Sequence, residues 1–203
     1  MYDLGPDLDA EVPPGTNILV SGPPLSGKRS LCLDILASGT EKGEGAIIVT
    51  TKDGADRVLR DFETRIAYED RPVAVVDCVT RQQGVGDIRD DERIKYTSSP
   101  VDMTGIGIKL SEFLQAFYQD QGIQQNRVML HSLSTLLMYA DLQTVFRFLH
   151  VFTGRIQSVD GLGVFAIDAS AHDDQTMNTL KQLFDGIVTT QEDGPPSVRL
   201  AGD

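Results

Sequence analysis

The 203-residue sequence predicts an α/β fold with a mainly parallel central β-sheet covered by helices on both faces. One observation is that short apolar runs alternate with amphipathic stretches, as they do when helices connect the strands of a parallel sheet. A second is that a glycine-containing turn joins the first strong apolar run to a helical stretch, which is typical of a phosphate-binding loop. We expect a single domain, 1–203, with its ligand at the carboxyl ends of the strands.

The individual elements follow from periodicity. Residues 1–16 are rich in Pro, Gly and Asp and are expected to be an irregular lead-in. Strands are predicted at the short apolar runs Asn17–Ser21, Ala46–Thr51, Val73–Val79, Ile94–Thr97, Arg127–Leu133 and Gly163–Ala169. Helices are predicted where apolar residues recur three or four positions apart, at Lys28–Ala37, Ala55–Ile66, Ile108–Gln121, Leu142–Val159 and Gln175–Phe184. A C-terminal β-hairpin is predicted around Asp193-Gly194.

The composition is strongly acidic, with 22 Asp and 8 Glu against 12 Arg and 6 Lys and a net charge of −12. Many short carboxylates with few lysines favour a protein from a salt-loving host, and an ordinary acidic cytosolic protein is the alternative. The charge argues against nucleic acid as a partner. No apolar run is long enough to span a bilayer and the first residues do not resemble a secretory signal, so we expect a cytoplasmic protein.

The stretch "NILVSGPPLSGKRSLCLDIL" carries the clearest motif, Gly22-x-x-x-x-Gly27-Lys28 between a strand and a helix. In such a loop the backbone N–H groups and the helix N-terminus surround phosphate oxygens, and the lysine reaches the outer phosphates. The alternative is a turn that only connects the two elements. The expected nucleotide-binding residues are Gly22, Pro23, Pro24, Leu25, Ser26, Gly27, Lys28, Arg29 and Ser30.

Arg29 departs from the usual motif, which has a Ser or Thr here to bind magnesium. Ser30 does not replace that hydroxyl, because it lies about 100° further round the helix. Arg29 either supplies positive charge to phosphates without a metal or turns towards solvent or a carboxylate.

These motifs together resemble the KaiC/RadA-like branch of the RecA superfamily and its haloarchaeal relatives, over roughly residues 12–202. The resemblance rests on "PPGTNILVSGPPLSGKRSL", "AIIVTTKDGADRVL", "RVMLHSLSTLL" and "DGLGVFAIDASAHDDQTMNTLKQLFDGIV". It implies a RecA-like P-loop fold, binding of ATP or ADP, and assembly into rings or filaments. A homo-oligomer and an unidentified protein partner are therefore expected.

Measured against that family, both Walker motifs are degenerate. Arg29 stands at the metal-binding hydroxyl, and His131 stands at the Walker B acid. Lys52 occupies the usual position of the base that activates water, with Asp53 beside it as a weak substitute. A hydrogen-bonded structural histidine is the alternative for His131. These changes make a role for Mg²⁺ doubtful.

Asp168 ends the last predicted parallel strand and is a candidate for a displaced metal contact, with capping of the following turn as the alternative. His172 and Asp173 follow at a place where related ATPases sense the γ-phosphate, or Asp173 caps the next helix. The histidines and the two cysteines lack metal-site spacing, so no zinc is expected.

Three functions remain in competition. The first is a nucleotide-binding regulatory or scaffold domain with weak or no hydrolysis. The second is an active ATPase of the same fold in signalling or motility, and the third is an interaction domain that no longer binds nucleotide. DNA recombination ranks last because of the acidic composition.

Overall fold

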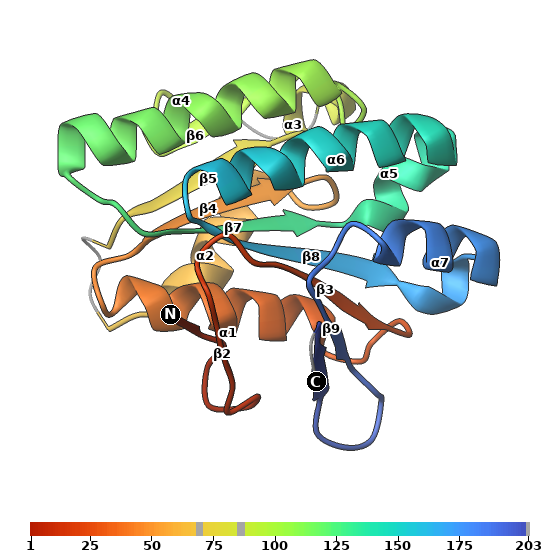
Figure 1. Ribbon diagram of the computed structural model, residues 1–203. Helices are drawn as coiled ribbons and strands as arrows, with labels where there is room; N and C mark the ends of the chain where they lie inside the picture. Colours follow the sequence, from red (N-terminus) through yellow and green to blue (C-terminus); the bar gives the residue numbers. More distant parts are fainter. Residues whose placement is uncertain (68–70, 85–87, 202–203) are drawn as a thin grey trace.

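The computed structural model describes residues 1–67, 71–84 and 88–201, and at its centre lies an eight-stranded sheet (Figure 1). The strand order is β10-β9-β3-β8-β7-β4-β5-β6, and only the β9–β10 pair is antiparallel. The predicted α/β fold with its C-terminal hairpin is therefore confirmed. The strands are β3 (Asn17–Gly22), β4 (Gly45–Thr50), β5 (Val73–Asp77), β6 (Ile94–Tyr96), β7 (Asn126–His131), β8 (Leu162–Asp168), β9 (Gly186–Thr189) and β10 (Ser197–Leu200).

Helices cover both faces of this sheet, because its strands are apolar on both sides. One face packs against α1 (Lys28–Thr40) and α2 (Ala55–Glu63). The other packs against α4 (Met103–Gln121), α5 (Leu133–Tyr139), α6 (Leu142–Ser158) and α7 (Asp174–Lys181). Two short helices, α3 (Thr80–Gln83) and the 3-10 helix η1 (Ala169–Ala171), follow the strand regions of β5 and β8.

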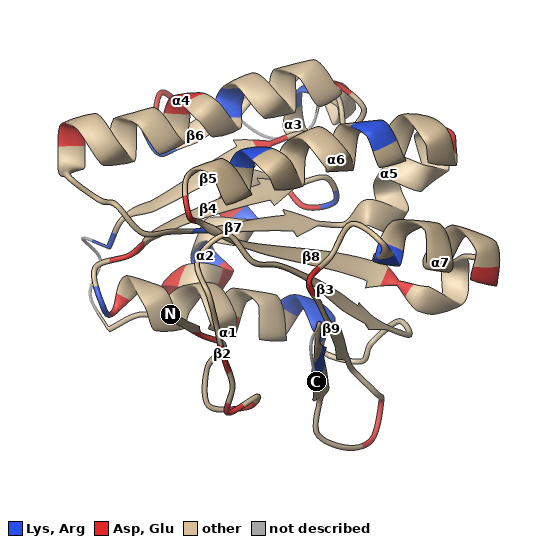
Figure 2. Ribbon diagram, viewed as in Figure 1, with Lys and Arg blue, Asp and Glu red and all other residues tan. Residues whose placement is uncertain are grey.

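Acidic residues are spread over helices and loops rather than gathered in one patch (Figure 2). Within the described part of the chain, none of the helices combines the length and the apolar character that a bilayer-spanning segment requires.

The N-terminal segment is more ordered than its composition indicates. The strands β1 (Tyr2–Asp3) and β2 (Glu11–Val12) pair antiparallel, and Tyr2, Leu4, Leu8 and Val12 are buried in the core beside α1. The prediction of an irregular lead-in is thus wrong for these residues. Two-residue strands show no periodicity, so the sequence pattern does not reveal them.

Several boundaries also differ from the prediction. α4 begins at Met103, five positions early, because the Asp102 side chain accepts a hydrogen bond from the Gly105 N–H and caps the helix. The strand expected to reach Leu133 ends at His131, and α5 starts directly afterwards. The sequence prediction missed α5, because it assigned the apolar residues of this helix partly to the preceding strand and partly to a loop.

A buried arginine ties the N-terminal segment to the sheet. Arg127 is fully buried, and its Nε lies 2.6 Å from Oε2 of Glu44, which is also buried. Its Nη1 donates to the carbonyl oxygens of Asp3 and Ile35, and its Nη2 lies 3.2 Å from Oδ2 of Asp3. A charged side chain is tolerated in a core when it is paired with an opposite charge and each of its hydrogen-bond donors has an acceptor.

Candidate functional site

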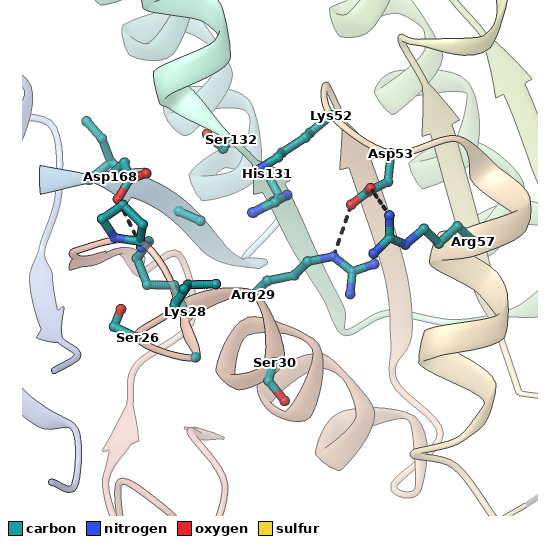
Figure 3. Close-up of a pocket in the computed structure, with 15 residues that line it drawn as sticks. Ser26, Lys28, Arg29, Ser30, Lys52, Asp53, Arg57, His131, Ser132 and Asp168 are labelled. Atoms are coloured by element: carbon teal, nitrogen blue, oxygen red, sulfur yellow. Dashed lines mark hydrogen bonds and ion pairs between the residues drawn. The ribbon is translucent and has the colours of Figure 1, made fainter. Parts of the chain in front are cut away.

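A cleft of about 440 Å³ opens at the carboxyl ends of β3, β4, β7 and β8 (Figure 3). The fold brings together in it most of the residues expected from the sequence, and adds Arg57, Ser132, Ala166 and Ile167. The expected residues that line the cleft are Pro24, Leu25, Ser26, Gly27, Lys28, Arg29, Ser30, Lys52, Asp53, His131 and Asp168. Gly22 and Pro23 lie at the base of the loop, outside the lining.

The loop between β3 and α1 turns sharply at Gly27. Gly27 has φ 79° and ψ 5°, a left-handed conformation that favours glycine, and α1 begins at the next residue. Gly22 passes so close to Thr190 that a Cβ there would lie 2.2 Å from the Thr190 hydroxyl oxygen. The Ser26 hydroxyl in turn lies 2.6 Å from that same oxygen. The loop is therefore held against the end of β9, with the N-terminus of α1 facing the cleft.

Lys28 lies across the mouth of the loop. Its Nζ donates to the Pro23 carbonyl and lies 3.2 Å from Oδ1 of Asp168, which stands opposite Gly22 in the β3–β8 register. The Asp168 carboxylate therefore balances the lysine and does not cap the following turn, although the Asp168 N–H donates to the Ser134 hydroxyl. A phosphate at the loop would compete with Asp168 for Lys28.

Arg29 is clamped between two carboxylates. Its Nε lies 3.3 Å from Oδ2 of Asp53, and its Nη2 lies 2.7 Å from Oδ2 of Asp61 on α2. Arg57, at the start of α2, pairs with the other carboxylate oxygen of Asp53 at a distance of 3.1 Å (Figure 3). Because both of its oxygens are paired with arginines, Asp53 is poorly placed to take a proton from water.

His131 ends β7, between β4 and β8. Burial, reinforced by the charge of Arg29 and opposed by Asp53, lowers the pKa of His131 from 6.5 to about 4. The imidazole is therefore neutral near pH 7 and cannot provide the negative charge of a Walker B acid. Lys52 lies exposed at the tip of β4, and among the described residues it forms neither a hydrogen bond nor an ion pair.

The charge of the cleft is opposite to that of the whole chain. Four cationic side chains line it, those of Lys28, Arg29, Lys52 and Arg57, against the carboxylates of Asp53 and Asp168, a formal balance of +2. Magnesium prefers oxygen ligands, chiefly carboxylates and water. Both carboxylates are already paired with cations, and no cluster of metal ligands occurs among residues 1–67, 71–84 and 88–201. These side chains fit a phosphate group better than they fit a divalent cation.

The residues that follow β8 form hydrogen bonds within the fold. The Asp173 side chain accepts a hydrogen bond of 2.8 Å from the Thr176 N–H and caps α7. His172 Nε2 lies 2.8 Å from the Ser134 hydroxyl oxygen, and burial lowers the pKa of this histidine. His172 lies outside the residues that line the cleft.

Sequence reasoning missed Arg57, although a signal for it was present. It stands four positions after Asp53, a spacing that brings the two side chains together at the start of a helix. Ser132, Ala166 and Ile167 line the cleft because of where the backbone places them, and no spacing pattern in the sequence predicts this.

The sheet and the loop together form a KaiC-like RecA fold. The solved structure of the KaiC-like protein PH0186 from Pyrococcus horikoshii superposes with a TM-score of 0.60, over 91% of this chain and 74% of that one, at 13% identity. The chain belongs to DUF7504, a family of unknown function whose model matches residues 15–190.

A sequence relative is the UPF0273 protein SSO1861 of Saccharolobus solfataricus, 31% identical over 126 residues. The match takes in 60% of this chain and 42% of the relative, so the chain spans about two fifths of that protein's length.

Proposed function

We propose that this chain is a nucleotide-binding domain that holds ATP or ADP without magnesium and with little or no hydrolysis. The observation that carries the proposal is the cationic cleft around the phosphate loop, which keeps Gly27 and Lys28. Arg29, His131 and Lys52 line this cleft, and the family resemblance puts them at the metal and base positions. The loop backbone and the α1 N-terminus would surround the phosphates. Lys28 and Arg29 would supply the positive charge that a magnesium ion otherwise provides.

The same residues argue against rapid hydrolysis. Hydrolysis requires a base near the attacking water, and Asp53 is held by two arginines. His131, with a pKa of about 4, is too weak a base to help. We infer that nucleotide occupancy acts as a signal, changing how the domain contacts a protein partner or further copies of itself. The composition supports a salt-rich cytoplasmic setting for that role.

The test is thermal unfolding of the purified protein with ATP or ADP, in magnesium and in EDTA, at high salt. A ligand at about one hundred times its Kd stabilises the folded state by about 2.7 kcal/mol, so binding is read as a rise in Tm. We expect the same rise in EDTA as in magnesium, no release of phosphate, and loss of the rise in Lys28→Ala. Lys181→Ala, a lysine on α7 outside the cleft, is the matched control.

Two outcomes would reject the proposal. A rise that requires magnesium, with phosphate release that Lys28→Ala abolishes, would establish an active ATPase. If no nucleotide raises the Tm of the wild-type protein, the cleft serves an interaction domain that does not bind nucleotide.

A further inference from the structure

A second hollow lies between α4 and α6, on the face of the sheet opposite α1 and α2 (Figure 1). It is a groove of about 420 Å³, which we call the α4–α6 groove. The described residues that line it all belong to these two helices: Met103, Thr104, Gly107 and Ile108 of α4, and Thr144, Arg147, Phe148, Val151, Phe152 and Arg155 of α6.

The α4–α6 groove has an apolar floor and apolar rims that are open to solvent. Phe152, 2% exposed, and the half-buried Phe148 form the floor, with ring centroids 5.2 Å apart. Ile108 on one rim is 51% exposed, and Val151 on the other is 60% exposed. Apolar surface in a groove of this kind is typical of a docking site.

The charge of the groove indicates which kind of ligand it can bind. Arg147 and Arg155 line it, and none of the described acidic residues does. α6 carries both arginines along its length, visible as its two basic segments in Figure 2. The carboxylates at the starts of the two helices, Asp102 and Asp141, are engaged in capping. On a chain of net charge −12, this basic and apolar surface is complementary to an acidic ligand.

The arginines are available for such a ligand to different degrees. Arg155 donates through Nη1 to the Gly107 carbonyl oxygen and so links α6 to α4. Arg147 is exposed, and within the described part of the chain it has no hydrogen bond or ion pair. Arg147 can therefore pair with an incoming carboxylate without losing an existing partner.

We propose that the α4–α6 groove binds one acidic amphipathic helix of a partner protein. The stretch of α6 from Thr144 to Arg155 extends about 16 Å, which matches about three turns of a helix lying in the groove. Apolar side chains of the partner would contact Ile108, Phe148 and Val151, and flanking Asp or Glu side chains would pair with Arg147. None of these residues lines the nucleotide cleft, so the inference does not depend on the proposed function.

The probe is a fluorescent amphipathic peptide of about 18 residues, with Leu at i, i+3, i+4 and i+7 and Glu on the flanks. Its twin carries Lys in place of every Glu. Binding to the full chain is followed by fluorescence anisotropy at moderate and high salt. We expect Val151→Asp and Arg147→Glu each to weaken the Glu peptide about tenfold or more, which corresponds to about 1.4 kcal/mol. Arg147→Glu should also improve binding of the Lys peptide.

The control is Arg199→Glu, an exposed arginine on β10 away from the groove, which should bind like the wild type. Both groove substitutions are at exposed positions, and circular dichroism with thermal unfolding verifies that the variants fold. The proposal is overturned if the Glu peptide does not bind, or if it binds all variants equally. It is also overturned if sedimentation shows a dimer that Val151→Asp dissociates, because the groove would then hold a second copy. ATP binding measured on the same variants reports separately on the cleft.

Discussion

Arg127 and Arg29 are both held by two acidic residues, but they lie at opposite ends of the strands. Arg127, near the amino ends, is 0% exposed and donates to the buried carboxylate of Glu44, to the Ile35 carbonyl oxygen and to the Asp3 carboxylate, which is 24% exposed. Arg29, at the carboxyl ends, is 26% exposed and lies in a cleft where cations outnumber carboxylates.

The difference shows that the surroundings of an ion pair decide its role. A buried pair with all partners present holds elements together, and losing one member leaves an uncompensated charge. A pair exposed to solvent contributes little to stability and can exchange one partner for another. We therefore assign Arg127 to the fold, whereas the proposed function gives Arg29 a role in ligand binding, and experiment can separate the two.

The largest effect is expected for Arg127→Ala. It leaves Glu44 buried without its cation, which costs about 3–5 kcal/mol of unfolding free energy. Chemical denaturation at constant salt measures the loss. Arg127→Met combined with Glu44→Met should recover much of it, because no unpaired charge remains. A loss no greater than that of Arg29→Ala would remove the distinction between the two arginines.

The next effect concerns pH and His131 in the cleft. The unfolded chain protonates this side chain near pH 6.5, and the folded protein does so only near pH 4. Between these values the unfolded state binds more protons, so the unfolding free energy falls as the pH is lowered from 6.5 towards 4. The decrease attributable to His131 is on the order of 3 kcal/mol. It is measured as the difference between the wild type and His131→Asn, and parallel pH profiles would contradict the assignment.

The smallest effect is expected for Arg29→Ala. Its loss of stability should be about 1 kcal/mol or less, because the ion pairs are partly exposed. Its Kd for ATP in EDTA should rise about tenfold, since a charge facing the phosphates is gone. Calorimetric titration measures both proteins, with Arg93→Ala, an arginine paired with Asp91 outside the cleft, as the control. An unchanged Kd would mean that Arg29 stays with Asp53 and Asp61 when nucleotide binds.

The phosphate loop was predictable because its signals are local. Gly22, Gly27 and Lys28 follow one another within a few residues, and the left-handed φ of Gly27 explains why glycine stands there. The alternation of apolar runs likewise predicts the sheet and most helices, since each run reports its own burial.

The ion pairs of the cleft were not predictable to the same degree. Arg29 meets Asp61 only because α1 and α2 lie on the same face of the sheet, and Lys28 meets Asp168 only because β8 lies beside β3. Neither arrangement is encoded in spacing along the chain. The buried N-terminal residues were missed because two-residue strands show no periodicity, and the Asp3–Arg127 contact joins positions that are distant in sequence.

Because both native thiols are buried, a single cysteine introduced on the surface of this chain can be labelled selectively. Burial raises the pKa of Cys32 and of Cys78 to about 12, so neither forms the thiolate that alkylating reagents attack. Leu25, at the tip of the phosphate loop, is 99% exposed. A Leu25→Cys variant would therefore accept a fluorophore at one position without prior removal of the native cysteines, and the dye would report directly on what enters the loop.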